Sequence, residues 1–95
     1  MILIMKEFGI ILSTRDIGEK IRKEITNGIN NNEVITVDFT DVNQITHSCA
    51  DEIFGKLAEE IGIHGLKKNV SIKNTNETTS TIIKYVIARR LSDSK

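Results

Sequence analysis

The chain has 95 residues, of which 39 % are hydrophobic and 27 % charged, and this composition predicts one small globular domain. Thirteen Lys and Arg residues balance thirteen Asp and Glu residues, so the formal net charge at pH 7 is zero. A neutral chain with three Phe, one Tyr and no Trp has neither the charge nor the stacking surface that nucleic acids or anionic membranes would select. Zero net charge also gives little protection against self-association, which leaves a homodimer open.

Cys49 is the only cysteine, so neither an internal disulfide nor a thiolate zinc site is expected. The apolar run at residues 1–5 ends at Lys6 and Glu7, and it is too short for a signal peptide or a membrane span. We therefore expect a cytoplasmic protein that forms a single domain over residues 1–95.

The first twelve residues contain two short apolar runs. Residues 2–5 and residues 9–12 predict two strands, and a turn near residues 6–9 would join them as an antiparallel hairpin. This hairpin would add an antiparallel edge to any sheet that follows.

A helix is predicted next. Ile17, Ile21 and Ile25 recur every four residues and draw an apolar stripe. Ser13, with Asp16 three positions later, resembles a capping box that would start this helix. A Gly and Asn cluster at residues 27–32 would end it, since both residues tolerate the left-handed conformation of a helix C-terminus.

The rest of the chain alternates between strands and helices. Residues 34–39 are β-branched and almost continuously apolar, which is typical of a central strand covered on both faces. A loop follows, and three further elements are predicted: a helix at 49–61 that ends at Gly62, a strand at 69–73 and a helix at 77–91. The order strand, strand, helix, strand, helix, strand, helix predicts an α/β fold: a small mixed, mostly parallel sheet with helices packed against it.

Residues 37–55 form the most distinctive segment. A hydrophobic strand ends in Asp38, a short loop contains Val42 and Ile45, and Ser48 stands where a helix opens. This pattern resembles the STAS-like family, relatives of the bacterial anti-sigma factor antagonists. The resemblance extends from about Gly9 to Ile87 and is sharpest at residues 38–55.

The resemblance implies a non-enzymatic, regulatory, protein-binding module. In the antagonists, a serine at the start of the second helix is phosphorylated by a histidine-kinase-like ATPase, and only the unphosphorylated form binds that partner. Ser48 occupies the matching position, with Thr46 as a weaker candidate, although residues 46–49 read Thr-His-Ser-Cys where the antagonists carry Asp-Ser-Ser-Gly. The expected partner-binding surface comprises Asp41, Asn43, Gln44, Thr46, His47, Ser48, Asp51 and Glu52.

Two other interpretations of Ser48 remain open. With Asp51 three positions later, Ser48 could act only as a helix cap in a structural or oligomerisation subunit. Alternatively, Ser48 or Cys49 could be the nucleophile of a small hydrolase with His47 as the base. Neighbours in sequence seldom point at one another, however, and a nucleophile needs its base within hydrogen-bond reach. We therefore expect no catalytic residues.

A magnesium site is the remaining candidate chemistry. Asp38 and Asp41 follow a predicted strand, and Asp51 and Glu52 lie in the next helix. Carboxylates are suitable ligands for Mg²⁺, but no glycine-rich phosphate loop of either common pattern accompanies them. Loop and helix-cap chemistry explains these carboxylates, so we expect neither a metal nor a cofactor.

Overall fold

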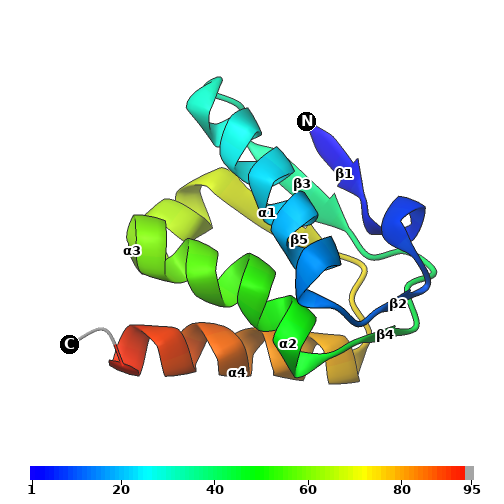
Figure 1. Cartoon of the computed structure of the whole chain (residues 1–95). Helices are drawn as coiled ribbons and strands as arrows, with labels where there is room; N and C mark the ends of the chain where they lie inside the picture. Colours follow the sequence, from blue (N-terminus) through cyan, green and yellow to red (C-terminus); the bar gives the residue numbers. More distant parts are fainter. Residues whose placement is uncertain (94–95) are drawn as a thin grey trace.

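The computed structural model describes residues 1–93, and Figure 1 shows strands and helices in alternation. The elements are β1 (Ile2–Ile4), the 3-10 turn η1 (Met5–Phe8), β2 (Ile11–Leu12), α1 (Arg15–Asn30), β3 (Ile35–Asp38), β4 (Gln44–Ile45), α2 (His47–Ala50), the π-helical turn η2 (Asp51–Gly55), α3 (Lys56–Asn69), β5 (Val70–Lys73) and α4 (Glu77–Asp93). None of the helices within this described part is long and apolar enough to cross a membrane.

The strands pair in parallel. The main sheet has the order β1-β3-β5, with Leu3, Val37 and Ile72 in register, and β2 and β4 form a separate parallel pair. The structure therefore confirms the α/β class with a mostly parallel sheet and packed helices.

The predicted N-terminal hairpin is wrong, because β1 and β2 belong to different sheets. Met5 is fully buried, so the chain turns through η1 to place this side chain in the core instead of reversing in a tight turn. Gly9 then leaves the turn at φ 137°, a conformation that glycine adopts readily. β2 pairs with the loop before α2, where Thr46 N donates to Leu12 O at 2.9 Å.

The helix α1 follows the predicted isoleucine stripe. Ile21 and Ile25 are fully buried, and the chain leaves the helix through Asn31 and Asn32, the latter at φ 62°. The cap lies one residue later than predicted: Thr14 Oγ1, not Ser13, accepts the backbone N–H of Ile17 at 3.1 Å.

The sheet is less enclosed than the sequence predicts. Ile35, Val37 and Phe39 are buried, as expected, but Thr36 and Asp38 on the other face of β3 are only half-buried. The prediction of a strand covered on both faces is therefore correct for one face alone. Polar side chains at alternate positions of β3 allow the second face to remain partly open to water.

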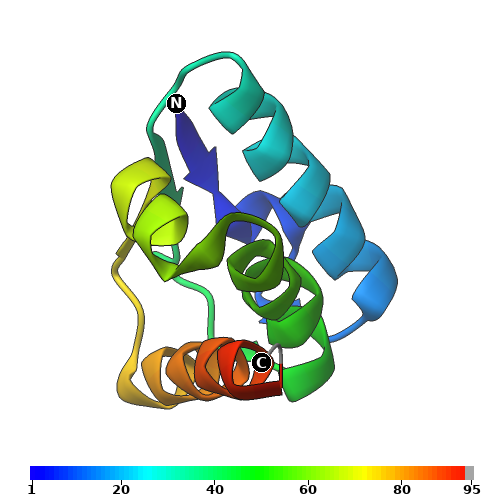
Figure 2. The same ribbon diagram turned by 90° about the vertical axis from the view of Figure 1, so that its left-hand side faces the viewer.

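One helical run forms the centre of the molecule. It begins at His47, passes through η2 and continues to Gly62, where φ 75° and ψ 169° interrupt the helix as predicted. The π-helical turn η2 packs against both α1 and α4, and Figures 1 and 2 show the run lying between these two helices. The first turn of this run carries Ser48.

Candidate functional site

The segment before α2 is anchored to the core and exposes polar side chains. Val42 and Ile45 are buried, and Asn43 N donates to Ile10 O at 2.8 Å. Asp41 lies at φ 62° and forms an exposed ion pair with Lys6 at 3.4 Å. The polar residues of this segment that face solvent are Asp41, Asn43 and Gln44. The loop therefore presents its predicted contact residues from a fixed backbone.

Thr46, not Ser48, caps the helix. Its hydroxyl accepts the backbone N–H of Cys49 at 3.2 Å and donates to the carbonyl oxygen of Ser13, also at 3.2 Å. The helix starts at His47, so Ser48 lies within the first turn rather than ahead of it, and its side chain is exposed. The prediction of Ser48 as the cap is wrong, because Thr46 has the extended backbone (φ −82°, ψ 159°) that lets its hydroxyl reach the third helical N–H.

This assignment predicts different effects for two hydroxyl deletions. Thr46→Ala removes the cap and the bond to Ser13, so it should lower the free energy of unfolding by about 1 kcal/mol. Ser48→Ala should change it by less than about 0.5 kcal/mol, as is usual for surface substitutions. Urea denaturation of the two variants measures both values. A larger loss of unfolding free energy in Ser48→Ala than in Thr46→Ala would show that Ser48 is the cap.

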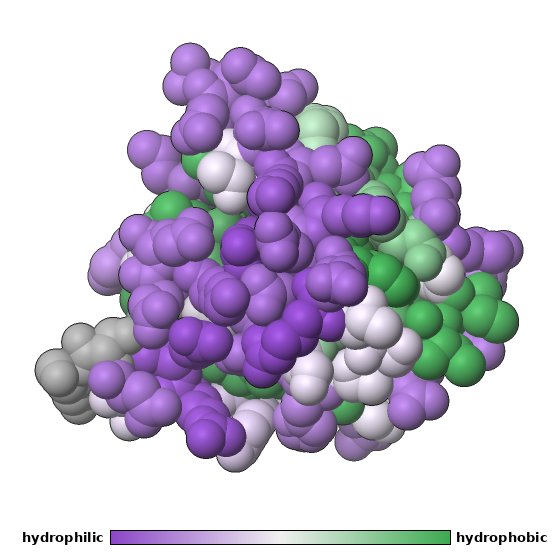
Figure 3. All heavy atoms as spheres, viewed as in Figure 1, coloured by the Kyte–Doolittle hydropathy of each residue, from purple (hydrophilic) through white to green (hydrophobic). Residues whose placement is uncertain are grey.

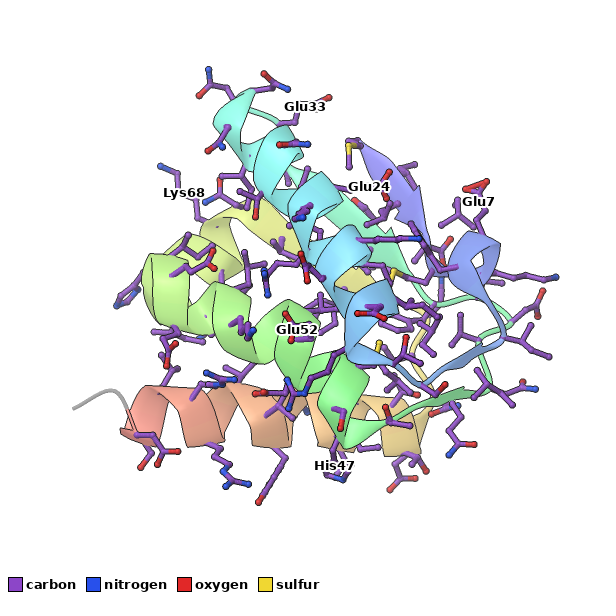
Figure 4. The ribbon with its side chains drawn as sticks, in the orientation of Figure 1. Glu7, Glu24, Glu33, His47, Glu52 and Lys68 are labelled. Carbon is purple, nitrogen blue, oxygen red and sulfur yellow. The ribbon has the colours of Figure 1, made fainter. Side chains whose placement is uncertain are left out.

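Glu52 points into the protein. It is only 4 % exposed, and Figure 4 shows its side chain on the side of the helical run that faces α1. Its carboxylate accepts hydrogen bonds from Arg22 at 2.7 Å, Lys56 at 3.0 Å and Arg15 at 3.2 Å. A buried carboxylate needs such partners, because an unpaired buried charge is strongly destabilising. The prediction that Glu52 contacts a partner protein is therefore wrong.

Asp51 joins the helical run to α4. Arg90 donates to its two carboxylate oxygens at 2.8 and 2.6 Å, the bidentate geometry in which guanidinium and carboxylate fit best. Arg15 adds a longer contact of 3.3 Å, and the Asp51 side chain is only 18 % exposed. Most of the hydrogen-bonding capacity of Asp51 is thus used within the domain, whereas Ser48 and His47 of the same turn are exposed.

Both carboxylates have lowered pKa values. The hydrogen bonds from Arg90 hold the pKa of Asp51 below its ordinary value, against the effect of partial burial. Burial alone would raise the pKa of Glu52, but hydrogen bonds from Lys56, Arg22 and Arg15 outweigh it and hold this pKa below its ordinary value as well. Both groups are therefore ionised at neutral pH.

These shifts predict an acid-sensitive fold. A carboxyl group whose pKa is lower in the folded chain stabilises it above the unfolded pKa and loses this contribution as the pH falls through the folded value. The free energy of unfolding should thus be level between about pH 5 and about pH 8 and decrease steadily toward about pH 2. Urea midpoints across this range test the slope, which should be shallower for Glu52→Gln; an identical slope would contradict the role of Glu52.

A pocket of about 320 Å³ lies beside Ser48, between the first turn of α2 and α4. His47 and Tyr85 meet edge to face at its rim, with ring centroids 5.5 Å apart. The charged side chains on its wall are paired with one another, as described above for Arg15, Asp51 and Arg90. Ser48 therefore lines a polar pocket together with arginines whose charges are largely balanced.

The residues considered for catalysis are not assembled into a catalytic group. Cys49 is fully buried, and desolvation together with the charge of Glu52 raises the pKa of its thiol to about 11. A protonated, buried thiol is a poor nucleophile. The ring of His47 packs against Tyr85, and His64 lies on the exposed side of α3.

The acidic residues considered for a magnesium site lie in separate places. Asp38 accepts hydrogen bonds from Thr40 and Asn74 at the end of the sheet, whereas Asp51 and Glu52 bind arginines and a lysine. Within residues 1–93, no group of three or more His, Cys, Asp or Glu side chains is placed to hold a metal ion.

The sequence pattern did not indicate the cationic partners of the carboxylates. Glu52 and Lys56 are four positions apart in the helical run, a spacing that favours an ion pair. Arg22 and Arg90, by contrast, lie 30 and 39 positions from their carboxylates. Only the packing of α1 and α4 against η2 brings these groups together.

The architecture defines a small α/β domain with a parallel sheet and an exposed serine in the first turn of its central helix. A family model described as a STAS-like domain of unknown function matches residues 18–80, and the chain belongs to this family. The matched segment includes the loop and the helical run, whereas Arg15 and the α4 residues that line the pocket lie outside it. Neither the curated proteins nor the solved structures contain a match to this chain.

Proposed function

We propose that this domain is a non-enzymatic regulatory module of the bacterial cytoplasm that binds a histidine-kinase-like ATPase and is switched by phosphorylation at Ser48. The binding surface would comprise the loop residues Asp41, Asn43 and Gln44 with His47 and Ser48. The exposed hydroxyl of Ser48 beside the arginine-lined pocket is the observation that carries the proposal.

The charge arrangement around Ser48 supports a phosphate there. Asp51 and Glu52 would repel a phosphate if they were unpaired. However, Asp51 is bound to Arg90 at 2.6 Å and Glu52 is bound to Arg22 at 2.7 Å. Arg15 holds both carboxylates only at 3.2–3.3 Å, and its side chain is 52 % exposed. Arg15 can therefore turn toward a new anion while both carboxylates keep their shorter bonds.

Thr46 is the weaker acceptor for a structural reason. Its hydroxyl already makes two hydrogen bonds, to Ser13 and Cys49, and modification would break both. The protonated thiol of Cys49 and the packing of the His47 ring against Tyr85 support a binding role over hydrolysis.

The expected effect of the switch is a loss of affinity. Ser48→Asp adds a negative charge at the proposed contact and should weaken binding to a histidine-kinase-like ATPase by at least about tenfold, which corresponds to about 1.4 kcal/mol. Ser92→Asp is the matched control, since Ser92 is also an exposed serine but lies in the last turn of α4.

Isothermal titration of the ATPase with the three proteins measures these affinities. Wild type and Ser92→Asp should bind alike. If Ser48→Asp bound as tightly as wild type, Ser48 would not be part of the contact surface. If none of the three proteins bound the ATPase, this class of partner would be rejected.

A further inference from the structure

The strand β1 lies at an edge of the main sheet, since the strand order is β1-β3-β5. Thr36 N donates to Met1 O at 2.9 Å, so the backbone groups of Met1 face β3. Because these groups alternate along a strand paired in parallel, those of Leu3 also face β3 and those of Ile2 and Ile4 face the open edge. An edge of this kind can accept another strand.

The side chains beside this edge are unusually apolar. Ile2 is 67 % and Ile4 37 % exposed, and Ile10 and Ile11 next to η1 are also exposed. Figure 3 shows apolar side chains gathered on the flank of the molecule that carries β1 and β2. Natural edge strands are commonly protected by charges, but the first charged side chain here is that of Lys6, beyond the end of β1.

We infer that β1 pairs with the same strand of a second copy of this chain, antiparallel about a two-fold axis at Leu3. In this register Ile2 lies opposite Ile4 of the partner subunit, so the outward-facing N–H of Ile4 in each copy meets the carbonyl oxygen of Ile2 in the other. A two-fold axis perpendicular to the sheet keeps the isoleucines of both copies on one face. The two sheets then become one continuous sheet.

Self-pairing fits the chemistry of this strand. Residues 1–5 carry no charged side chain, so the antiparallel arrangement places no like side-chain charges opposite one another. A two-fold contact also requires a patch that complements itself, and a strip of isoleucines does so. The strand is only three residues long, so the contact is smaller than the roughly 800 Å² per partner of a standard interface. A contact of this size is typical of a weak dimer.

Sedimentation velocity from about 1 μM to about 1 mM tests the dimer. Wild type should shift from monomer to dimer over this range. Ile2→Lys should remain monomeric, because it places a charge on the edge without removing a buried side chain. Tyr85→Lys, at an exposed position on α4, is the matched control and should dimerise like wild type. A monomer at all concentrations, or a dimer that persists in Ile2→Lys, would overturn the proposal.

Amide hydrogen exchange followed by NMR gives a second readout on the unaltered protein. The N–H of Ile4 should become more protected as the concentration rises, whereas that of Leu3, which faces β3, should be protected throughout. Concentration-independent exchange at Ile4 would overturn the proposal even if a dimer formed. The result is independent of Ser48, since Ser48→Asp should dimerise like wild type.

Discussion

Replacement of Glu52 by Gln is expected to lower the free energy of unfolding by about 3 kcal/mol, the low end of the range for breaking a buried ion pair. The substitution keeps the size of the side chain but removes the charge that Arg22 and Lys56 share. Arg22 also donates to the backbone carbonyl of Glu52 at 2.9 Å, so its guanidinium would stay at the site with only Glu60, 4.0 Å away, as an anionic partner. The site holds η2 against α1, and the loss should affect the whole domain.

Glu19→Gln is the matched control. Glu19 forms an ion pair with Lys23 at 2.9 Å, but this pair lies on the exposed side of α1, where salt bridges contribute little to stability. Urea denaturation of both variants therefore separates a buried charge from a surface charge. Similar losses in the two variants would show that the Glu52 cluster does not stabilise the fold.

Gly18→Ala is expected to cost about 2 kcal/mol, although alanine is the better helix former by about 1 kcal/mol. A Cβ atom at Gly18 would lie 2.8 Å from Cβ of Glu52 and 2.9 Å from the carbonyl oxygen of Cys49. The second contact is with backbone, which no rotamer change relieves. The variant would have to move α1 away from the start of the central helical run, and so weaken the contacts of Arg15 and Arg22 as well.

Gly65→Ala provides the comparison. The atoms nearest to a Cβ at Gly65 belong to the side chain of Ile61, the closest at 3.1 Å, and a side chain can shift. The thermal midpoint of Gly65→Ala should therefore stay closer to that of wild type than the midpoint of Gly18→Ala. If Gly18→Ala were as stable as wild type, the close packing of α1 on the helical run would be contradicted.

The sequence predicted the parts of the fold that local patterns determine. The isoleucine stripe of α1, the β-branched strand β3 and the helix break at Gly62 each depend on neighbouring residues, and each is present. The N-terminal hairpin failed because Met5 is an internal core residue and not the last residue of a strand. Nothing in residues 1–12 alone shows that their strand partners lie beyond residue 34.

The structure gives some of the predicted site residues roles other than those the sequence predicts. Ser48 and His47 are exposed, as a contact surface requires, whereas the cap belongs to Thr46 and the carboxylate of Glu52 is buried. A sequence pattern does not locate the start of a helix to within one or two residues. The hydroxyl at position 46 and the hydroxyl at position 48 were therefore both possible caps. The direction of Glu52 depends on α1, which contributes Arg15 and Arg22 from a distant part of the chain.

The proposed switch at Ser48 is tested most directly by mapping phosphate on the intact domain. The protein is incubated with MgATP and a histidine-kinase-like ATPase that binds it, and the modified residue is identified by mass spectrometry. We predict a single phosphate on Ser48 that is absent from Ser48→Ala and unchanged in Ser92→Ala. A domain that stays unmodified, or that carries phosphate at Thr46 or elsewhere while Ser48 is free, would contradict the account.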